Sequence, residues 1–335
     1  MRIGLAFDIK TDAPVAPGQA DDWQDEFDSP ETVAAIAAAI RSLGHQVIEL
    51  GDGRELIEKL LADPPELVFN IAEGHGVGRN REARVPAVCE MLGVPYVGSD
   101  PLTLSATLDK DVGRRLTASH GVAVPAGGLI DSNNPPQGLS FPAIVKPAWE
   151  GSSKGVSPAS VVRSVGELSA IVETHRQRYR QPLLVEEFID GDEITVGLLG
   201  SAEAPAVLGI MRILPRKPGS GPFIYDHTVK SDCLKHLIYE SPAQLPANII
   251  AAIEQSARTA YRALGCRDFA RIDFRVRDGV PYFLEANPLP GLSPSVGDIV
   301  LLAKGYGVGH TELIGRIVQA ALERLHLKTH TRDAV

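Results

Sequence analysis

The chain has few cysteines, with three among 335 residues. Cys89, Cys233 and Cys266 lie far apart and form no Cys-x-x-Cys pair, so we expect neither disulfides nor structural zinc, and a reducing cytoplasm fits. Basic residues are also in deficit, because 33 Lys and Arg stand against 42 Asp and Glu. Without a dense basic stripe to neutralise phosphates, a nucleic-acid partner is not expected.

Long apolar runs are missing as well. None approaches the length that spans a bilayer, so no membrane partner is expected. The Walker A pattern for phosphate binding is absent. Residues 151–155 do match Gly-x-Ser-x-Gly, the nucleophile elbow of α/β-hydrolases, which must lead directly into a helix. Pro158 follows closely and disfavours that helix, so a hydrolase is the weaker alternative.

The first hundred residues alternate between strand and helix patterns. Strands are predicted at residues 2–7, 47–50 and 67–71. The helices between them begin after an N-cap at Ser29 and near residue 54. This βαβαβ order predicts a parallel sheet, whose ligands bind beyond the carboxyl ends of the strands.

The pattern changes from residue 143 onward, where antiparallel strands alternate with helices. Strands are predicted at residues 143–146, 183–188 and 194–199, and helices at 247–264 and 311–325. The fold class is therefore α/β, with an α+β C-terminal half. Residues 8–28 form a long acidic connection, and loops of this length are either functional lids or disordered. Both interpretations stay open.

Residues 270–291 predict two short strands around a turn at Asp278-Gly279. A three-residue loop with Gly279 in the left-handed conformation would place the even-numbered residues of both strands on one apolar face. The opposite face would then carry Arg271, Asp273, Arg275, Phe283, Glu285 and Asn287.

That polar face combines two carboxylates and an amide with a cation. Hard oxygen ligands of this kind suit Mg²⁺, so Asp273, Glu285 and Asn287 are candidate metal ligands, and Arg271 is left to meet a negative reacting group. A solvated strand face with an incidental ion pair is the alternative. It leaves the Asn-Pro-Leu-Pro-Gly sequence that ends at Gly291 unexplained.

A second candidate site begins at the strand that ends in Lys146. The Gly-Ser-Ser-Lys-Gly loop at residues 151–155 follows, and its small residues let backbone N–H groups approach an anion, with Lys154 as a further donor. Farther along, a strand that ends in Glu186-Glu187 could hold an adenine edge, and Glu193 could accept from ribose hydroxyls. Most hairpins of this kind are purely structural.

Together these segments resemble the ATP-grasp superfamily, and most closely its D-alanine–D-alanine ligase family. The resemblance extends from about residue 67 over most of the chain. It depends on three runs in order: Val-Lys-Pro…Glu-Gly-Ser-Ser, Glu-Glu-Phe-Ile…Glu and Arg-Ile-Asp…Leu-Glu-Ala-Asn-Pro-Leu-Pro-Gly. It implies an ATP-grasp fold behind an N-terminal Rossmann-like domain. The implied divisions are an N-terminal domain at 1–105, a central lobe at 106–182 and a C-terminal lobe with the metal and catalytic site at 183–335.

The resemblance also implies site residues, position by position. ATP would be held by Lys110, Lys146, Ser153, Glu186, Glu187, Phe188, Ile189, Glu193 and Lys230. Two Mg²⁺ ions, for which Mn²⁺ could substitute, would be held by Asp273, Glu285 and Asn287. The oxyanion would be steadied by Arg271 and the backbone of Gly291, and Ser152 would help to place the substrate.

The departures from the family pattern fall on amino-acid recognition. The N-terminal Gly-Gly-x-Ser-x-Glu, whose acid binds the first amine, is replaced by Phe-Asp-Ile-Lys ending at Lys10. The sequence also departs from the family pattern in the residues after His75, at Ser231 and around Ser295. The candidate substrate contacts are Glu73, His75 and Ser295. Glu73 would hold the ammonium group in place of the missing acid, or would only cap its loop.

The expected function is an ATP- and Mg²⁺-dependent carboxylate–amine ligase that forms a dipeptide through an acyl phosphate. One alternative is a ligase of other amino acids or acids, for example in secondary metabolism. Another is a catalytically silent ATP-binding module. The expected partners are small amino-acid-like molecules, and a homodimer stays open.

Overall fold

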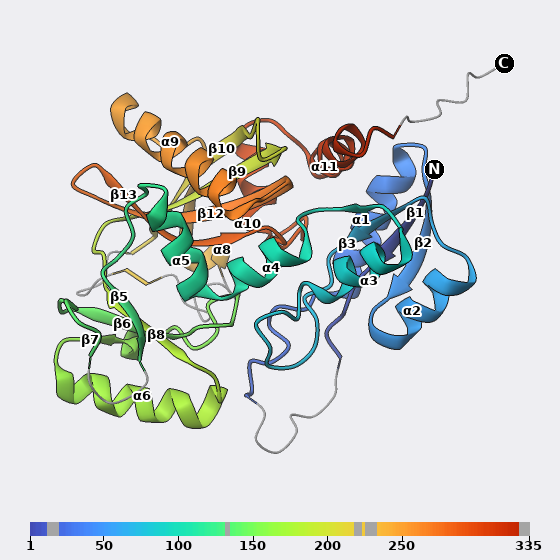
Figure 1. Ribbon diagram of the computed structural model, residues 1–335. Coiled ribbons are helices and arrows are strands. Elements are labelled where there is room, and N and C mark those ends of the chain that lie inside the picture. Colours follow the sequence, from blue (N-terminus) through green and yellow to red (C-terminus); the bar gives the residue numbers. More distant parts are fainter. Residues whose placement is uncertain (12–19, 131–134, 218–222, 225–232, 328–335) are drawn as a thin grey trace.

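The computed structural model describes residues 1–11, 20–130, 135–217, 223–224 and 233–327. The predictions for Lys230 and Ser231 therefore lie outside the described residues. Three sheets make up the described chain, and Figure 1 shows them as three lobes with helices packed on each. None of the helices in these ranges combines the length and apolar character needed to cross a membrane.

The N-terminal lobe is a four-stranded parallel sheet of order β2-β1-β3-β4, which confirms the predicted βαβαβ arrangement. Its elements are β1 Arg2–Ala6, α1 Pro30–Ser42, β2 Gln46–Gly51, α2 Gly53–Ala62, β3 Leu67–Asn70, α3 Arg84–Leu92 and β4 Tyr96–Val97. Helix α1 begins as predicted, because the Ser29 hydroxyl accepts from the Thr32 N–H at 3.2 Å and Pro30 occupies the first turn.

The C-terminal lobe is a five-stranded antiparallel sheet of order β11-β10-β9-β12-β13. Its elements are β9 Asp192–Gly200, β10 Ala206–Pro215, α8 Cys233–His236, β11 Leu237–Glu240, α9 Ala247–Leu264, β12 Asp268–Arg277, β13 Val280–Asn287, α10 Asp298–Gly305 and α11 His310–Arg324. Helix α9 covers one face of the sheet, whereas α10 and α11 cover the other. Because α11 also packs against α1, the two lobes share one apolar core.

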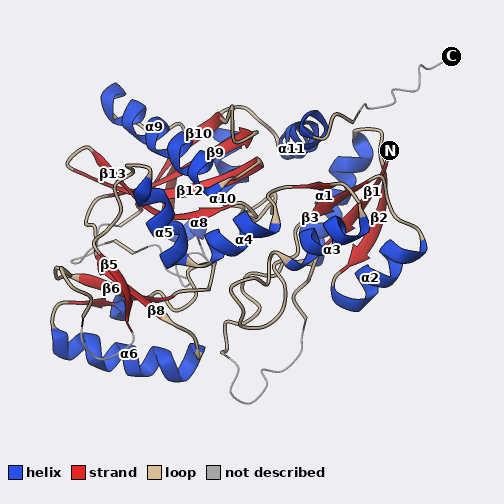
Figure 2. Cartoon of the chain, in the orientation of Figure 1, coloured by secondary structure: helices blue, strands red, loops and turns tan. Residues whose placement is uncertain are grey.

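The central lobe is a four-stranded sheet of order β5-β8-β6-β7, and α6 lies against it (Figure 2). Its elements are β5 Gly127–Ile130, β6 Ala143–Pro147, a 3₁₀ turn at Pro158–Ser160, β7 Val161–Val162, α6 Val165–Tyr179 and β8 Leu183–Glu187. The predicted division at residue 183 runs through this sheet, because β8 pairs with both β5 and β6. We therefore propose a division after residue 189.

Two helices join the N-terminal lobe to the central lobe. They are α4 Pro101–Leu108 and α5 Lys110–Ser119. Both pack on β13 and α9 of the C-terminal lobe rather than on the central sheet. Lys110, at the first position of α5, is therefore held beside the β12–β13 hairpin.

The turn of that hairpin differs from the prediction. Arg277 pairs with Val280, so the loop has two residues, and Asp278 and Gly279 both have positive φ, 53° and 79°. Two such residues match a type I′ turn, which follows the strand twist. The register then shifts between Phe274 and Asp273, which is a bulge.

Because of the bulge, the predicted pairing of polar residues is found only in the part of the hairpin that lies beyond the bulge, away from the turn. Beyond it, Asp273 pairs with Glu285 and Arg271 with Asn287, as predicted. Before it, Phe283 pairs with Phe274 in the core, not with the polar residues. The extra residue in the bulge, Leu284, lies in a pocket of the site rather than in the core.

The stability of the hairpin should depend on this aromatic pair. Phe274 and Phe283 are 0% and 1% exposed, with ring centroids 6.1 Å apart. We expect Phe283→Ala to lower the free energy of unfolding by about 3–5 kcal/mol, because it leaves a cavity. Val280→Ala, on the same strand but 41% exposed, should cost less than about 1 kcal/mol. Denaturant unfolding of both variants measures the difference, and equal costs would contradict the placement of Phe283.

Candidate active site

Two pockets meet where the three lobes converge. The larger, about 520 Å³, lies between the N-terminal and C-terminal lobes, and the smaller, about 100 Å³, lies between the central and C-terminal lobes. Lys110, Glu150 and Glu285 line both pockets. These three residues therefore form a shared wall at which groups bound in the two pockets would meet.

The smaller pocket contains the predicted nucleotide residues that the structure describes. They are Lys110, Lys146, Ser153, Glu186, Glu187, Phe188, Ile189 and Glu193. Ion pairs organise them: Lys146 Nζ lies 2.6 Å from Glu186 Oε1, and Arg275 Nη2 lies 2.7 Å from Glu193 Oε2. Arg275, which the sequence analysis had given no role, also donates to the Ile189 carbonyl at 3.2 Å. It thereby ties the end of the central lobe to β12.

The hairpin face brings the predicted metal ligands together. Asp273 and Glu285 are directly opposite on β12 and β13, and the Asn287 amide donates to Asp273 Oδ2 at 3.2 Å. Burial and the nearby charge of Glu285 raise the pKa of Asp273, although Arg271 opposes this. Two close carboxylates and an amide oxygen are the hard donors that Mg²⁺ takes, so the residues fit this metal.

Lys110 supplies the positive charge at this face. Its Nζ lies 2.7 Å from Glu285 Oε2 and donates to the Glu150 carbonyl at 2.5 Å. Burial alone would raise the pKa of Glu285, but Lys110 and Lys146 lower it well below its usual range. A cation thus already lies against the carboxylate predicted to bind metal.

Arg271 is buried between two carboxylates. Its guanidinium lies 2.9 Å from Asp273 and 3.3 Å from Asp298 at the start of α10. Gly291 and Ser295 line the same larger pocket as Arg271. Asp298 was missed by the sequence analysis, because its position follows from the packing of α10 and not from a motif.

The loop at residues 151–155 separates the two pockets. Ser152 and Ser153 both have positive φ, 49° and 58°, so consecutive residues line the larger and the smaller pocket respectively. Gly151 fits closely beside them, because a Cβ there would lie 2.6 Å from Glu26 Oε1 and would force that side chain to shift. No helix follows directly, which disfavours the nucleophile-elbow interpretation.

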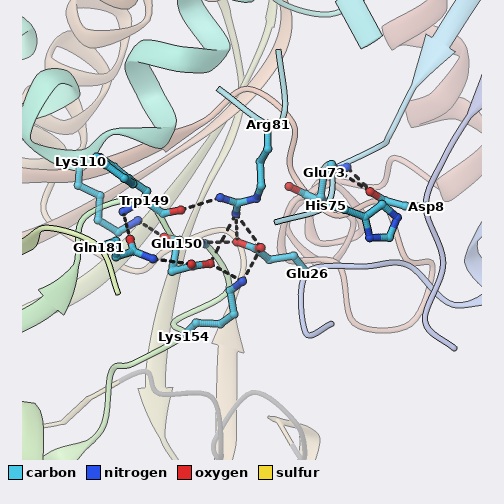
Figure 3. A network of polar contacts seen from close by, with 12 residues as sticks. Asp8, Glu26, Glu73, His75, Arg81, Lys110, Trp149, Glu150, Lys154 and Gln181 are labelled. Atoms are coloured by element: carbon cyan, nitrogen blue, oxygen red, sulfur yellow. Dashed lines mark hydrogen bonds and ion pairs between the residues drawn. The ribbon is translucent and has the colours of Figure 1, made fainter. Parts of the chain in front are cut away.

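Buried ion pairs fix this loop to the N-terminal lobe, and Figure 3 shows the network. Glu26 accepts from Arg81 and from Lys154, each at 2.7 Å, and from the Gly151 N–H. Lys154 also pairs with Glu150. Lys154 is therefore held by carboxylates and is not the free anion donor that the sequence suggested. Burial raises the pKa of Glu26, but Arg81 and Lys154 outweigh it and lower the pKa.

The acidic connection thus contributes directly to the site. In its described part, Asp22 accepts from the Tyr179 hydroxyl at 2.7 Å, and both Asp21 and Asp22 pair with Arg178 of α6. Glu26 follows within the same segment. Sequence reasoning missed its role because no spacing relates residue 26 to residue 151.

The predicted substrate residues separate into two groups. Glu73 and Ser295 line the larger pocket. His75 does not: its ring lies against Phe27, with centroids 4.8 Å apart, and its Nε2 is 2.9 Å from Asp52. The capping role considered for Glu73 belongs to Asp8, which accepts from the N–H groups of Glu73 and Gly74 at 3.2 and 2.7 Å.

Comparison with known proteins agrees with this architecture. Residues 132–319 match the family described as D-ala D-ala ligase C-terminus. A D-alanine–D-alanine ligase of Bordetella petrii is 32% identical over 298 residues, which cover 87% of this chain and 86% of the relative. The chain belongs to the D-alanine–D-alanine ligase family.

Other similar proteins include one without an assigned activity. The uncharacterized protein y4sG of Sinorhizobium fredii is 32% identical over 305 residues, with 87% of each chain covered. A crystal structure of D-alanine–D-alanine ligase from Bacillus anthracis has a TM-score of 0.76 at 24% identity and covers 97% of this chain and 98% of that one. The predicted family, fold class and ATP-dependent ligase class are thereby confirmed.

Glu82 provides a test of the charges in the larger pocket. Burial and the charges of Glu26 and Glu285 raise its pKa to about 7, although Arg81 opposes them. A raised carboxyl pKa means that the folded protein binds the proton more tightly, so stability falls as pH rises from about 4.5 to 7. Glu82→Gln removes this cost. Its melting temperature should exceed that of the parent by roughly a few °C at pH 8 and by less at pH 5.

Thermal melts at both pH values check this prediction. Glu58→Gln serves as the control, because Glu58 lies exposed on α2 in an ion pair with Arg54. An advantage of Glu82→Gln that is equal at pH 5 and pH 8 would contradict the assigned pKa.

Proposed function

We propose that this protein joins a carboxylate to an amine at the expense of ATP, through an acyl phosphate. The observation that supports this most directly is the shared wall of Lys110, Glu150 and Glu285. ATP in the smaller pocket would direct its γ-phosphate to this wall. A carboxylate in the larger pocket would reach the same point from the other side, which is the proximity that phosphoryl transfer needs.

The assignment of the nucleotide rests on residues in the smaller pocket. Lys110 and Lys146, now paired with Glu285 and Glu186, would turn to the phosphates. Adenine would lie along residues 186–189, next to Leu284, with ribose at Glu193. Lys230 stays a prediction for the phosphates.

Asp273, Glu285 and Asn287 would hold two Mg²⁺ ions, for which Mn²⁺ could substitute. When bound, the metal supplies positive charge that neutralises the phosphates. The ion pair between Lys110 and Glu285 supports this proposal, because the carboxylate already attracts a cation.

The proposed reaction has two steps. A substrate carboxylate oxygen attacks the γ-phosphorus and ADP leaves, giving the acyl phosphate. The amine nitrogen then attacks the acyl carbon and loses a proton, and phosphate departs. Arg271 and the Gly291 N–H would meet the negative charge on the acyl oxygen, and Ser152 would help to place the substrate. The protein needs no nucleophile of its own.

The named product with support from relatives is D-alanyl-D-alanine. The altered amine-recognition segments support a lower efficiency with D-alanine than with another amino acid. A silent nucleotide-binding module is disfavoured, because mere binding would not require Arg271 next to the metal residues. The unpaired, buried Cys89 and Cys266 support the cytoplasm as the location. A homodimer stays a prediction.

The metal assignment is tested by Glu285→Ala. Loss of this carboxylate should abolish turnover at ordinary Mg²⁺, because phosphate neutralisation is worth several kcal/mol in the transition state. Phosphate release with ATP and amino acids measures the loss. Glu254→Ala, on the outer side of α9, serves as the control. Near-normal activity of Glu285→Ala would refute the metal assignment.

Arg271→Lys tests the oxyanion role. Lysine keeps the positive charge but lacks the planar guanidinium group with its paired N–H donors. We therefore expect kcat to fall by roughly 10²-fold or more, with little change in the affinity for ATP. Steady-state kinetics and ATP binding are measured in parallel. A variant that loses ATP binding but keeps its kcat would instead assign Arg271 to the nucleotide.

A further inference from the structure

The larger pocket carries an excess of negative charge at its N-terminal end. The carboxylates on its C-terminal side have cation partners, because Glu285 pairs with Lys110 and Asp298 shares Arg271 with Asp273. In the ion-pair network around Glu26, the two carboxylates of Glu26 and Glu150 pair with the two cations of Arg81 and Lys154. Each of these cations therefore already has a carboxylate partner.

Glu73 and Glu82 lie outside these pairs. Both line the larger pocket, and Glu82 is only 8% exposed. Within the described part of the chain, no side-chain hydrogen bond or ion pair reaches either carboxylate. Figure 3 shows Glu73 between Arg81 and Asp8, with its only marked contact through the backbone. Two neighbouring carboxylates thus face the pocket without an ion pair to any described residue. The charge of Arg81 acts on both, but Arg81 is already paired with Glu26 and Glu150.

Asp28 adds a third carboxylate to this wall. Its charge is partly offset by Lys10, whereas nearby Asp8 acts against it, and Asp25 lines the same pocket. Burial and the surrounding acids raise the pKa of Asp28, Glu73 and Glu82. A cation bound at this end of the pocket would therefore favour the ionised form of Glu73 and Glu82, the two acids here that no described cation pairs.

We infer that the amino acid bound at this end of the pocket carries a basic side chain. Its α-ammonium would compensate one of the two carboxylates, and its side-chain cation the other. This inference rests on the proposed function, because it names the substrate class of the same pocket. It concerns the amino acid whose carboxylate is phosphorylated, since the charge of Glu82 also acts on Lys110 and Glu285 at the shared wall.

The physical reason is the cost of a buried, uncompensated carboxylate. Such a group either keeps a proton or loses several kcal/mol of solvation, which a partner charge can return. A neutral amino acid would compensate one carboxylate and would remove water from the other. A basic amino acid would leave neither carboxylate unpaired. The pocket should therefore discriminate between amino acids whose side chains differ only by a terminal ammonium group.

The experiment compares matched pairs of amino acids in phosphate release with ATP and Mg²⁺. Lysine is compared with norleucine, and ornithine with norvaline, each as the D and the L form, with D-alanine as the second amino acid. Each pair has the same carbon chain and differs by the terminal ammonium group. We expect kcat/KM to be at least about tenfold higher for the basic member of a pair in one stereochemical series.

Variants identify the residues responsible. Glu82→Gln and Glu73→Gln should each reduce the preference for the basic member by about tenfold, mainly through KM, without lowering kcat/KM for the neutral member to the same degree. Glu58→Gln is the matched control and should keep the parental preference. A thermal shift caused by lysine but not by norleucine, in the presence of ADP and Mg²⁺, gives a second readout that does not depend on turnover.

The outcomes separate the inference from the proposed function. Equal or better turnover of the neutral members would overturn the inference and leave the ligase function in place. So would a preference that survives in Glu82→Gln and Glu73→Gln. If no amino acid stimulates phosphate release by the parent, the proposed function fails and the inference fails with it.

Discussion

Glu26 is the group on which the arrangement of the site depends. It comes from the acidic connection after β1, yet its carboxylate binds Arg81 of the N-terminal lobe and Lys154 of the central lobe. It also accepts from the Gly151 N–H, where a Cβ would lie 2.6 Å from its Oε1. Because the group is buried, removal of either cation would leave a charge without compensation, which is costly. The network therefore holds two lobes and the loop between the two pockets in one geometry.

A second property follows from how the other charges are compensated. In the smaller pocket two described lysines already have a carboxylate: Lys110 has Glu285, and Lys146 has Glu186. ATP and metal would exchange partners within a set that is balanced beforehand. At the N-terminal end of the larger pocket, Glu73 and Glu82 form no ion pair with the residues that the structure describes. The protein thus retains an electrostatic cost where a substrate would bind, which is a common property of functional sites.

The β12–β13 hairpin shows how far sequence reasoning extends. The polar residues near Asn287 were predicted correctly, because alternation along a strand places every second side chain on one face. The turn was predicted wrongly. A two-residue loop followed by a bulge at Leu284 pairs the residues near Asn287 in the same way as a three-residue loop without a bulge. Only the register distinguishes these cases, and the register depends on Phe274 and Phe283 packing in the core.

The sequence by itself determined the family and the parallel N-terminal sheet, and it grouped residues that line the smaller pocket. Those features depend on local patterns and on ordered motifs, which a single chain displays directly. The tertiary structure decided the position of Glu26, the placement of Asp298 next to Arg271 and the displacement of His75 from the pocket. It also decided that Glu73 and Glu82 face one pocket without an ion pair to any described residue. Such pairings join residues that are distant in sequence, and they follow from how the lobes pack, which no local pattern encodes.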